Sequence, residues 1–211
     1  MLTVKEYIEL YKKPFEDLNK KEQKLIQEYN KYLIERYPFL TPYNVWTGKL
    51  DEDYNYSNTW MDDMPDGWRI AFGDEMLEKL REALLKVPYN PKDNWDVPAV
   101  CENDTWLNHY RLCQVKEKYG SLRWYDNGAT KEVHDIIHEY EIKSEQTCIA
   151  CGEPAKYISQ GWISPFCEKC AKEIYERNIK RYSENKMTLD EAIKKYPFDE
   201  DYKTVEEWFK D

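Results

Sequence analysis

The sequence predicts an α+β protein with a helical N-terminal region, a central β-hairpin or small antiparallel sheet, and a C-terminal treble-clef-like zinc module with flanking helices. Three observations support this prediction. Helical periodicity with helix-start signals recurs near both ends of the chain, alternating residues flank Tyr119-Gly120 as in a hairpin, and four of the six cysteines form two C-x2-C pairs. The 211 residues suffice for a buried core.

Two helices are predicted at the N-terminus, over residues 3–13 and 19–36. Each opens with a capping box, Thr3-x-x-Glu6 and Asn19-x-x-Glu22, in which the first side chain caps backbone N–H groups of the helix and the glutamate reaches back. These helices form the first predicted segment, residues 1–36.

The second predicted segment, residues 37–143, is rich in aromatic residues. Up to residue 73 the rings alternate with Pro, Gly and Asn without a lasting period, which predicts irregular backbone. Helices are predicted over 74–86 and 130–141. The third segment, 144–211, holds the cysteines and two short helices with capping boxes at Thr188 and Thr204. We expect 37–211 to form one compact unit.

The four paired cysteines are Cys148, Cys151, Cys167 and Cys170, spaced C-x2-C-x15-C-x2-C. This spacing is typical of a structural Zn²⁺ held by four thiolates, with no open position for a substrate. A hairpin predicted around Gln160-Gly161 and a helix after Cys170 complete the order of a treble clef. The alternative is two redox pairs or free thiols, although a thioredoxin-like pair would need a βαβ context that the sequence lacks.

Residues 110–125 carry four basic residues and one acidic residue, in a chain whose net charge is −10. A two-residue turn at Tyr119-Gly120 would place Val115 opposite Trp124 and Lys116 opposite Arg123. Like charges in that position destabilise a hairpin unless an anion lies between them.

The hairpin is therefore a candidate site for the phosphate of a nucleotide or nucleic acid. Lysine and arginine would bind the phosphate, and aromatic rings would offer stacking faces. The candidate ligand-binding residues are Lys116, Lys118, Arg123, Trp124 and Tyr125. The alternative is that Glu117 and acidic neighbours neutralise the basic side chains in salt bridges.

Composition and charge exclude several classes of protein. With 15% aromatic residues the chain is not of a disordered type, and 31 basic against 41 acidic residues exclude a generally basic nucleic-acid binder. No apolar run is long enough to span a membrane, and the N-terminus has no signal-like apolar region. A cytoplasmic protein without a membrane partner is expected.

Several motifs together resemble a family of proteins carried by tailed phages and prophages. They are the run Val115–Tyr125, the segment Met64-Pro65-Asp66-Gly67-Trp68, and Cys148-x-x-Cys151-Gly152 with Gly161-Trp162. The similarity covers roughly residues 37 to 172, and it implies a phage or mobile-element origin and a host-directed role. The family has no established activity to carry over.

Three functions follow as hypotheses. The first is a non-enzymatic zinc-containing protein that binds nucleotide or nucleic-acid phosphate through the hairpin. The alternative is a counter-defence or host-takeover inhibitor that binds a host protein through the acidic aromatic stretch 51–66. The third is a metal-dependent phosphoesterase or nuclease that uses the carboxylates of Asp51, Asp53, Asp62 or Asp63 with Mg²⁺.

Overall fold

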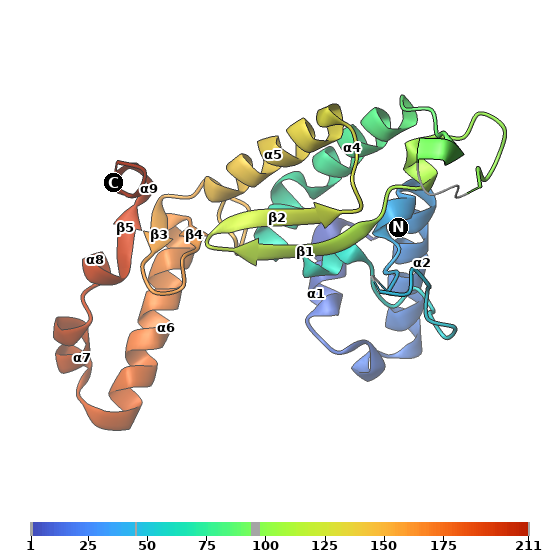
Figure 1. Cartoon of the computed structure of the whole chain (residues 1–211). Helices are drawn as coiled ribbons and strands as arrows, with labels where there is room; N and C mark the ends of the chain where they lie inside the picture. Colours follow the sequence, from blue (N-terminus) through green and yellow to red (C-terminus); the bar gives the residue numbers. More distant parts are fainter. Residues whose placement is uncertain (1, 45, 94–97, 211) are drawn as a thin grey trace. The chain divides into compact units, whose positions relative to one another are not determined.

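The computed structural model describes residues 2–44, 46–93 and 98–210. It confirms the α+β fold class, with helices at both ends and two small antiparallel sheets (Figure 1). The chain divides into a first unit (1–64, 72–116 and 123–140) and a second unit (65–71, 117–122 and 141–211). The unit borders fall inside the hairpin and inside a helix, whereas the predicted segments end at residues 36 and 143.

The first unit begins with helices α1 (Val4–Tyr11) and α2 (Lys20–Arg36), and both start at the predicted capping boxes. The Thr3 side chain accepts the N–H of Glu6, and the Asn19 side chain accepts those of Lys21 and Glu22. The two helices meet through tyrosines: the ring centroids of Tyr7 and Tyr29 lie 4.8 Å apart.

Aromatic residues supply much of the remaining core of the first unit. The ring of Phe39 packs edge-on against Tyr110, and Phe72 packs against Tyr140, each pair with centroids 5.4 Å apart. Helix α4 (Asp74–Leu85) buries Leu77 and other apolar residues, and α5 runs over Lys131–Glu145. Rings therefore do much of the packing that aliphatic side chains do elsewhere.

The prediction of irregular backbone up to residue 73 is wrong for its last part. Helix α3 (Asp66–Trp68) continues into the π-helical turn η4 (Arg69–Gly73), which leads directly into α4. A π turn inserts one residue into the helix, so the apolar residues on either side no longer share one 3.6-residue period. Pro65 precedes the helix, where its missing N–H costs nothing.

Short 3-10 turns connect the longer elements of the first unit. They are η1 (Phe15–Asp17), η2 (Pro38–Leu40), η3 (Trp60–Asp63), η5 (Pro91–Asp93) and η6 (Trp106–Asn108).

The predicted hairpin is formed by β1 (Leu112–Lys118) and β2 (Ser121–Asp126). Its two-residue turn is confirmed, with φ of 55° at Tyr119 and 78° at Gly120, as a type I′ turn requires. A Cβ on Gly120 would also lie 3.1 Å from the Cγ2 atom of Ile163, so the turn favours glycine for both conformation and space.

The second unit contains a three-stranded antiparallel sheet of order β4-β3-β5. Strands β3 (Tyr157–Ser159) and β4 (Pro165–Phe166) form the predicted second hairpin. Strand β5 (Tyr202–Thr204), which the sequence analysis missed, pairs with the other edge of β3. The chain thus returns near its end to complete the sheet beside the cysteines.

Four helices of the second unit follow the cysteine segment: α6 (Glu168–Lys186), α7 (Leu189–Lys195), α8 (Phe198–Asp201) and α9 (Val205–Trp208). Helices α6 and α7 lie side by side (Figure 1), and the rings of Tyr182 and Tyr196 stack at 4.9 Å. The capping boxes predicted at Thr188 and Thr204 are confirmed at the starts of α7 and α9.

Candidate functional site

The second unit brings the four paired cysteines together. Their sulfur atoms all lie within 4.8 Å of one another, and the Sγ atoms of Cys151 and Cys167 are 3.6 Å apart. Cys148 is buried, and the other three are half-buried. Among the described residues, these cysteines form the only group of three or more His, Cys, Asp or Glu side chains that a single metal ion could contact.

A tight backbone turn presents the first cysteine pair. The N–H of Gly152 donates to the carbonyl oxygen of Cys148 at 3.0 Å, and φ at Gly152 is 85°. A side chain at Gly152 would also collide with Gly67, because a Cβ there would lie 2.6 Å from the Gly67 carbonyl oxygen. Glycine is thus required at the end of this turn.

The start of helix α6 presents the second cysteine pair. Cys167 is the N-cap residue, and its sulfur accepts the N–H of Cys170 at 3.5 Å. Next to it, Glu168 forms 2.6 Å ion pairs with Lys172 of the same helix and with Lys156, and the second pair joins the helix start to the chain before β3. The order of turn, hairpin and helix is the treble-clef-like arrangement predicted from the spacing.

Burial raises the pKa of the thiols, and the hydrogen bonds among them differ in their effect from one cysteine to the next. Burial is the main cause that raises the pKa of Cys151 to about 11, and burial together with hydrogen bonds from Cys167 and Cys151 raises the pKa of Cys170. Burial would also raise the pKa of Cys167, but hydrogen bonds to its sulfur, first from the Cys170 N–H, lower it overall. A cation among the sulfurs would favour the thiolate form of all of them.

The sulfur positions fit a tetrahedral metal ion. With Zn–S bonds of about 2.3 Å, tetrahedral geometry sets the sulfur atoms about 3.8 Å apart. The Cys151 and Cys167 sulfurs are 3.6 Å apart, and all four lie within 4.8 Å of one another. A disulfide would need about 2.05 Å. Four thiols without a carboxylate or imidazole make a soft donor set, as metals such as zinc prefer.

The segment Gly67-Trp68 packs directly against this site. The Gly67 N–H donates to the Ile149 carbonyl oxygen at 2.9 Å, and the buried Trp68 indole N–H donates to the Thr147 carbonyl oxygen at 2.9 Å. A Cβ on Gly67 would lie 2.2 Å from the Cys148 carbonyl oxygen, so the backbone at Gly67 lies directly against the backbone of the cysteine turn. Nothing in the cysteine spacing or in the segment itself indicates that the two lie side by side.

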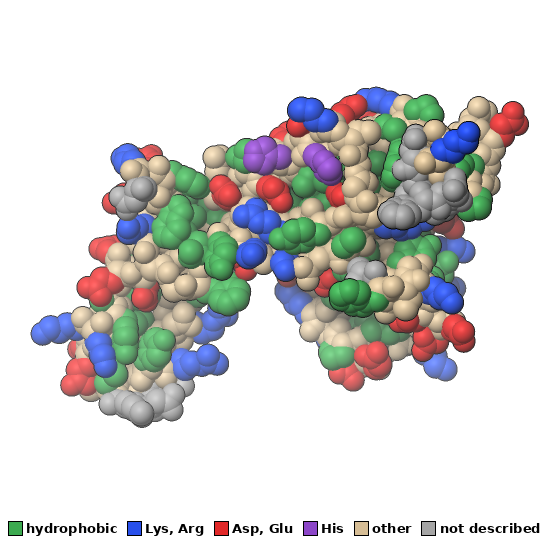
Figure 2. Space-filling model, viewed as in Figure 1, with side chains coloured by type: hydrophobic (Ala, Val, Ile, Leu, Met, Phe, Trp, Pro, Cys, Tyr) green, Lys and Arg blue, Asp and Glu red, His purple; other side chains and the backbone are tan. Residues whose placement is uncertain are grey.

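The predicted phosphate-binding residues of the hairpin divide between its two faces. Lys116 and Lys118 are two residues apart on β1 and therefore lie on the same face. The two-residue turn places Lys116 opposite Arg123 of β2. The Lys116 ammonium group lies 2.5 Å from Gln114 Oε1 and 5.4 Å from the ring centroid of Tyr125. Figure 2 shows Lys and Arg side chains over the place where Figure 1 draws the hairpin.

Trp124 lies on the other face of the hairpin from these residues. Its side chain is 5% exposed, packed on the same face as Val115, and its indole N–H donates to the Tyr110 hydroxyl at 3.0 Å. A ligand on the basic face does not reach a ring in this position. Tyr125, at 42% exposed, is the aromatic residue that accompanies the basic side chains.

The carboxylate of Glu117 accepts hydrogen bonds from N–H groups and does not pair with the hairpin lysines. Glu117 accepts the N–H of Gly120 at 2.7 Å and the indole N–H of Trp162 at 3.2 Å. Within the described part of the chain, neither Lys116 nor Lys118 forms an ion pair. The salt-bridge alternative therefore does not account for these two lysines.

Part of the acidic aromatic stretch 51–66 forms hydrogen bonds within the stretch, and the carbonyl oxygens of Asn55 and Tyr56 accept from α2 side chains. Asp62 accepts the backbone N–H of Thr59 at 2.7 Å, and the Tyr54 hydroxyl donates to the Asn58 carbonyl oxygen at 2.6 Å. Of the residues described, Asp51, Asp53, Asp62 and Asp63 form no group that a single metal ion could contact.

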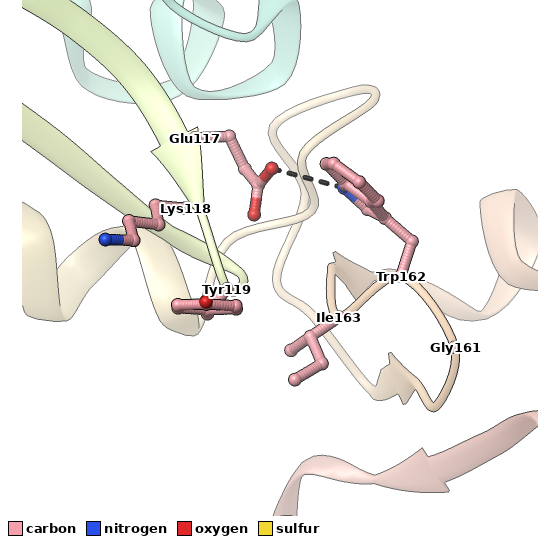
Figure 3. A pocket seen from close by; sticks show the side chains of 6 residues that line it. All are labelled: Glu117, Lys118, Tyr119, Gly161, Trp162 and Ile163. Atoms are coloured by element: carbon pink, nitrogen blue, oxygen red, sulfur yellow. Dashed lines mark hydrogen bonds between the residues drawn. The ribbon is translucent and has the colours of Figure 1, made fainter.

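Two exposed aromatic side chains were not among the candidate site residues. Tyr119 and Trp162 line a hollow of about 400 Å³ in the second unit, together with Glu117, Lys118, Gly161 and Ile163 (Figure 3). Both rings follow short strands at turns, where a large apolar side chain has little to pack against. That position is the signal that could have identified them.

Comparisons with protein-family models, curated proteins and solved structures gave no match. None of the described helices is long and apolar enough to cross a membrane.

Proposed function

We propose that the chain is a non-enzymatic zinc-containing binding protein, in which Cys148, Cys151, Cys167 and Cys170 hold a structural Zn²⁺. The observation that supports the metal is the approach of four sulfur atoms to within 4.8 Å. Bound there, the ion would cross-link the cysteine turn to the start of α6 and so stabilise the fold. Four thiolate ligands leave the ion no open position for a substrate.

The ligand proposed for the basic face of the hairpin is a nucleotide or nucleic-acid phosphate. Lys116 opposes Arg123, and two lysines there form no ion pair among the described residues. A phosphate over this face would accept charge-assisted hydrogen bonds from the two lysines, while Tyr125 offers a ring beside it. Following the phage resemblance, we place this activity in the cytoplasm of an infected cell.

The test is the binding of ATP and of inorganic tripolyphosphate to the zinc-loaded protein, measured by calorimetry. The double variant Lys116→Ala/Arg123→Ala should lose tenfold or more in affinity, since hydrogen bonds to charged groups contribute about 1.5–3 kcal/mol each. The matched control is Lys24→Ala/Lys31→Ala, which removes two exposed charges from α2. Equal affinity of the two double variants would contradict the proposal.

A further inference from the structure

Two large aromatic side chains face a hollow of the second unit (Figure 3). Tyr119 is 72% exposed and Trp162 is 80% exposed. The carboxylate of Glu117 connects the loops that carry them, because it accepts N–H groups from Gly120 and from the Trp162 indole. In Figure 3 the Ile163 side chain lies lower than both rings, on the opposite side from Glu117. The two hydrogen bonds of Glu117 thus fix the loops that carry the rings.

Folding does not explain the choice of tyrosine at position 119. Its φ of 55° lies in the left-handed region, which favours Gly, Asn or Asp at this position of a type I′ turn. A bulky residue there is strained, and its exposed ring adds little to the core. Backbone strain with an exposed ring beside a hollow points to a ligand.

Trp162 borders a second hollow as well as the first. This one, of about 360 Å³, shares Gly161 and Trp162 with the first hollow and extends to Asn178 and Tyr182 of α6. Tyr182 is 48% exposed, so a third ring follows the first two. Figure 2 shows exposed hydrophobic side chains where Figure 1 draws β3, β4 and the hairpin turn.

Positive charge continues this line of hollows. Asn178 also lines a third hollow, of about 280 Å³, with Arg177, Lys180 and Arg181. From Arg177 to Tyr182 the chain has three basic residues and no acidic one, although its net charge is −10. The acidic side chains on the first two hollows are Glu117, which already accepts two N–H groups, and Asp201.

We infer that these three hollows form a track for single-stranded nucleic acid, called here the aromatic track and defined by Tyr119, Trp162, Tyr182 and the basic residues of α6. Unpaired bases stack on exposed rings whatever their sequence, and basic side chains follow the backbone. A mononucleotide would fill only one hollow, and a duplex keeps its bases stacked on one another. The inference rests on the proposed function for its ligand class but uses other residues.

The test measures the anisotropy of a fluorescein-labelled single-stranded DNA of about 12 nucleotides and mixed sequence, titrated with zinc-loaded protein at low salt. Trp162→Ala should weaken binding about tenfold or more, and so should Tyr119→Asn. Asparagine suits the left-handed turn, so Tyr119→Asn should melt no lower than the wild type while it binds less well. The control Trp46→Ala removes an indole that is 92% exposed in the first unit and should bind as the wild type does.

The outcomes separate this inference from the hairpin proposal. If Lys116→Ala/Arg123→Ala loses tripolyphosphate binding while Trp162→Ala binds DNA as the wild type does, the hairpin proposal stands and the track is wrong. If Trp162→Ala and Arg177→Ala/Lys180→Ala weaken DNA binding while tripolyphosphate binds neither wild type nor variant, the track stands alone. Equal affinity for duplex and single strand, or binding of a proline-rich peptide instead of DNA, would overturn the track.

Discussion

The backbone N–H of Gly67 donates to the carbonyl oxygen of Ile149 at 2.9 Å, which fastens the start of helix α3 to the first cysteine turn. The two residues are far apart in the sequence, and each lies in a motif that the sequence analysis singled out. The contact makes the segment around Trp68 a structural part of the candidate metal site.

This close approach makes Gly67 sensitive to any side chain. Gly67→Ala would place a Cβ 2.2 Å from the Cys148 carbonyl oxygen. We expect a loss of about 3 kcal/mol or more in the free energy of unfolding, because neither backbone can move without disturbing the cysteine turn. Urea unfolding measures the loss. Gly161→Ala is the matched control, since nothing lies within 4 Å of a Cβ there. Similar stability of the two variants would be inconsistent with the contact.

Removal of the metal should unfold chiefly the second unit. A chelator should lower its melting temperature, and Cys148→Ser or Cys167→Ser should do the same without a chelator. Cys101→Ser and Cys113→Ser, which change exposed thiols outside the cluster, should melt as the wild type does. Differential scanning calorimetry measures these transitions. Identical melting with and without the chelator would refute a structural role for the metal.

A buried carboxylate in the first unit should make the free energy of unfolding depend on pH in the acidic range. Burial alone would raise the pKa of Asp104, but hydrogen bonds from Asn108, His109 and the N–H groups of Val100 and Thr105 lower it from 3.8 to about 2. The folded pKa is the lower one, so the stabilisation is complete above the unfolded value and disappears as the pH falls through about 2.

Asp104→Asn should therefore lose about 2 kcal/mol at pH 7 and converge on the wild type between about pH 5 and pH 2. Urea unfolding of both proteins at each pH gives the difference between their free energies of unfolding. Any metal loss at low pH affects both proteins alike and cancels in that difference. The exposed Asp53→Asn should change little. A difference between Asp104→Asn and the wild type that stays constant across this pH range would count against the assignment.

Strand β5 is predicted to stabilise the cysteine region although it lies near the end of the chain. Tyr202 is 7% exposed and stacks on Phe198 at 4.7 Å, while its strand pairs with β3. Tyr202→Ala should cost about 3 kcal/mol in thermal or urea unfolding. The control Phe209→Ala removes a ring that is 55% exposed. Equal stability of both variants would mean that β5 is dispensable.

Features encoded by neighbouring residues were predictable from the sequence. A capping box joins residues three apart, so the starts of α1, α2, α7 and α9 could be read directly. The turn at Tyr119-Gly120 and the cysteine spacing are equally local. These patterns gave the fold class and the grouping of the cysteines.

Features that depend on distant contacts could not be predicted in this way. Nothing near Gly67 in the sequence indicates that it meets Ile149, and nothing near Tyr202 indicates a third strand beside β3. The π turn at Arg69–Gly73 interrupts the 3.6-residue apolar period, so the helix around it could not be recognised from the sequence pattern. Trp124 is a predicted ligand contact, but its place opposite Val115 puts its side chain in the core, where it is 5% exposed.

Native mass spectrometry of the purified protein, followed by denaturing mass spectrometry, tests the central claim most directly. The wild type should carry one zinc ion per chain in the native spectrum and none after denaturation, and Cys151→Ser should carry less zinc while Cys113→Ser keeps it. A native wild-type chain of apoprotein mass, isolated from zinc-supplemented cells without chelator, would contradict the claim.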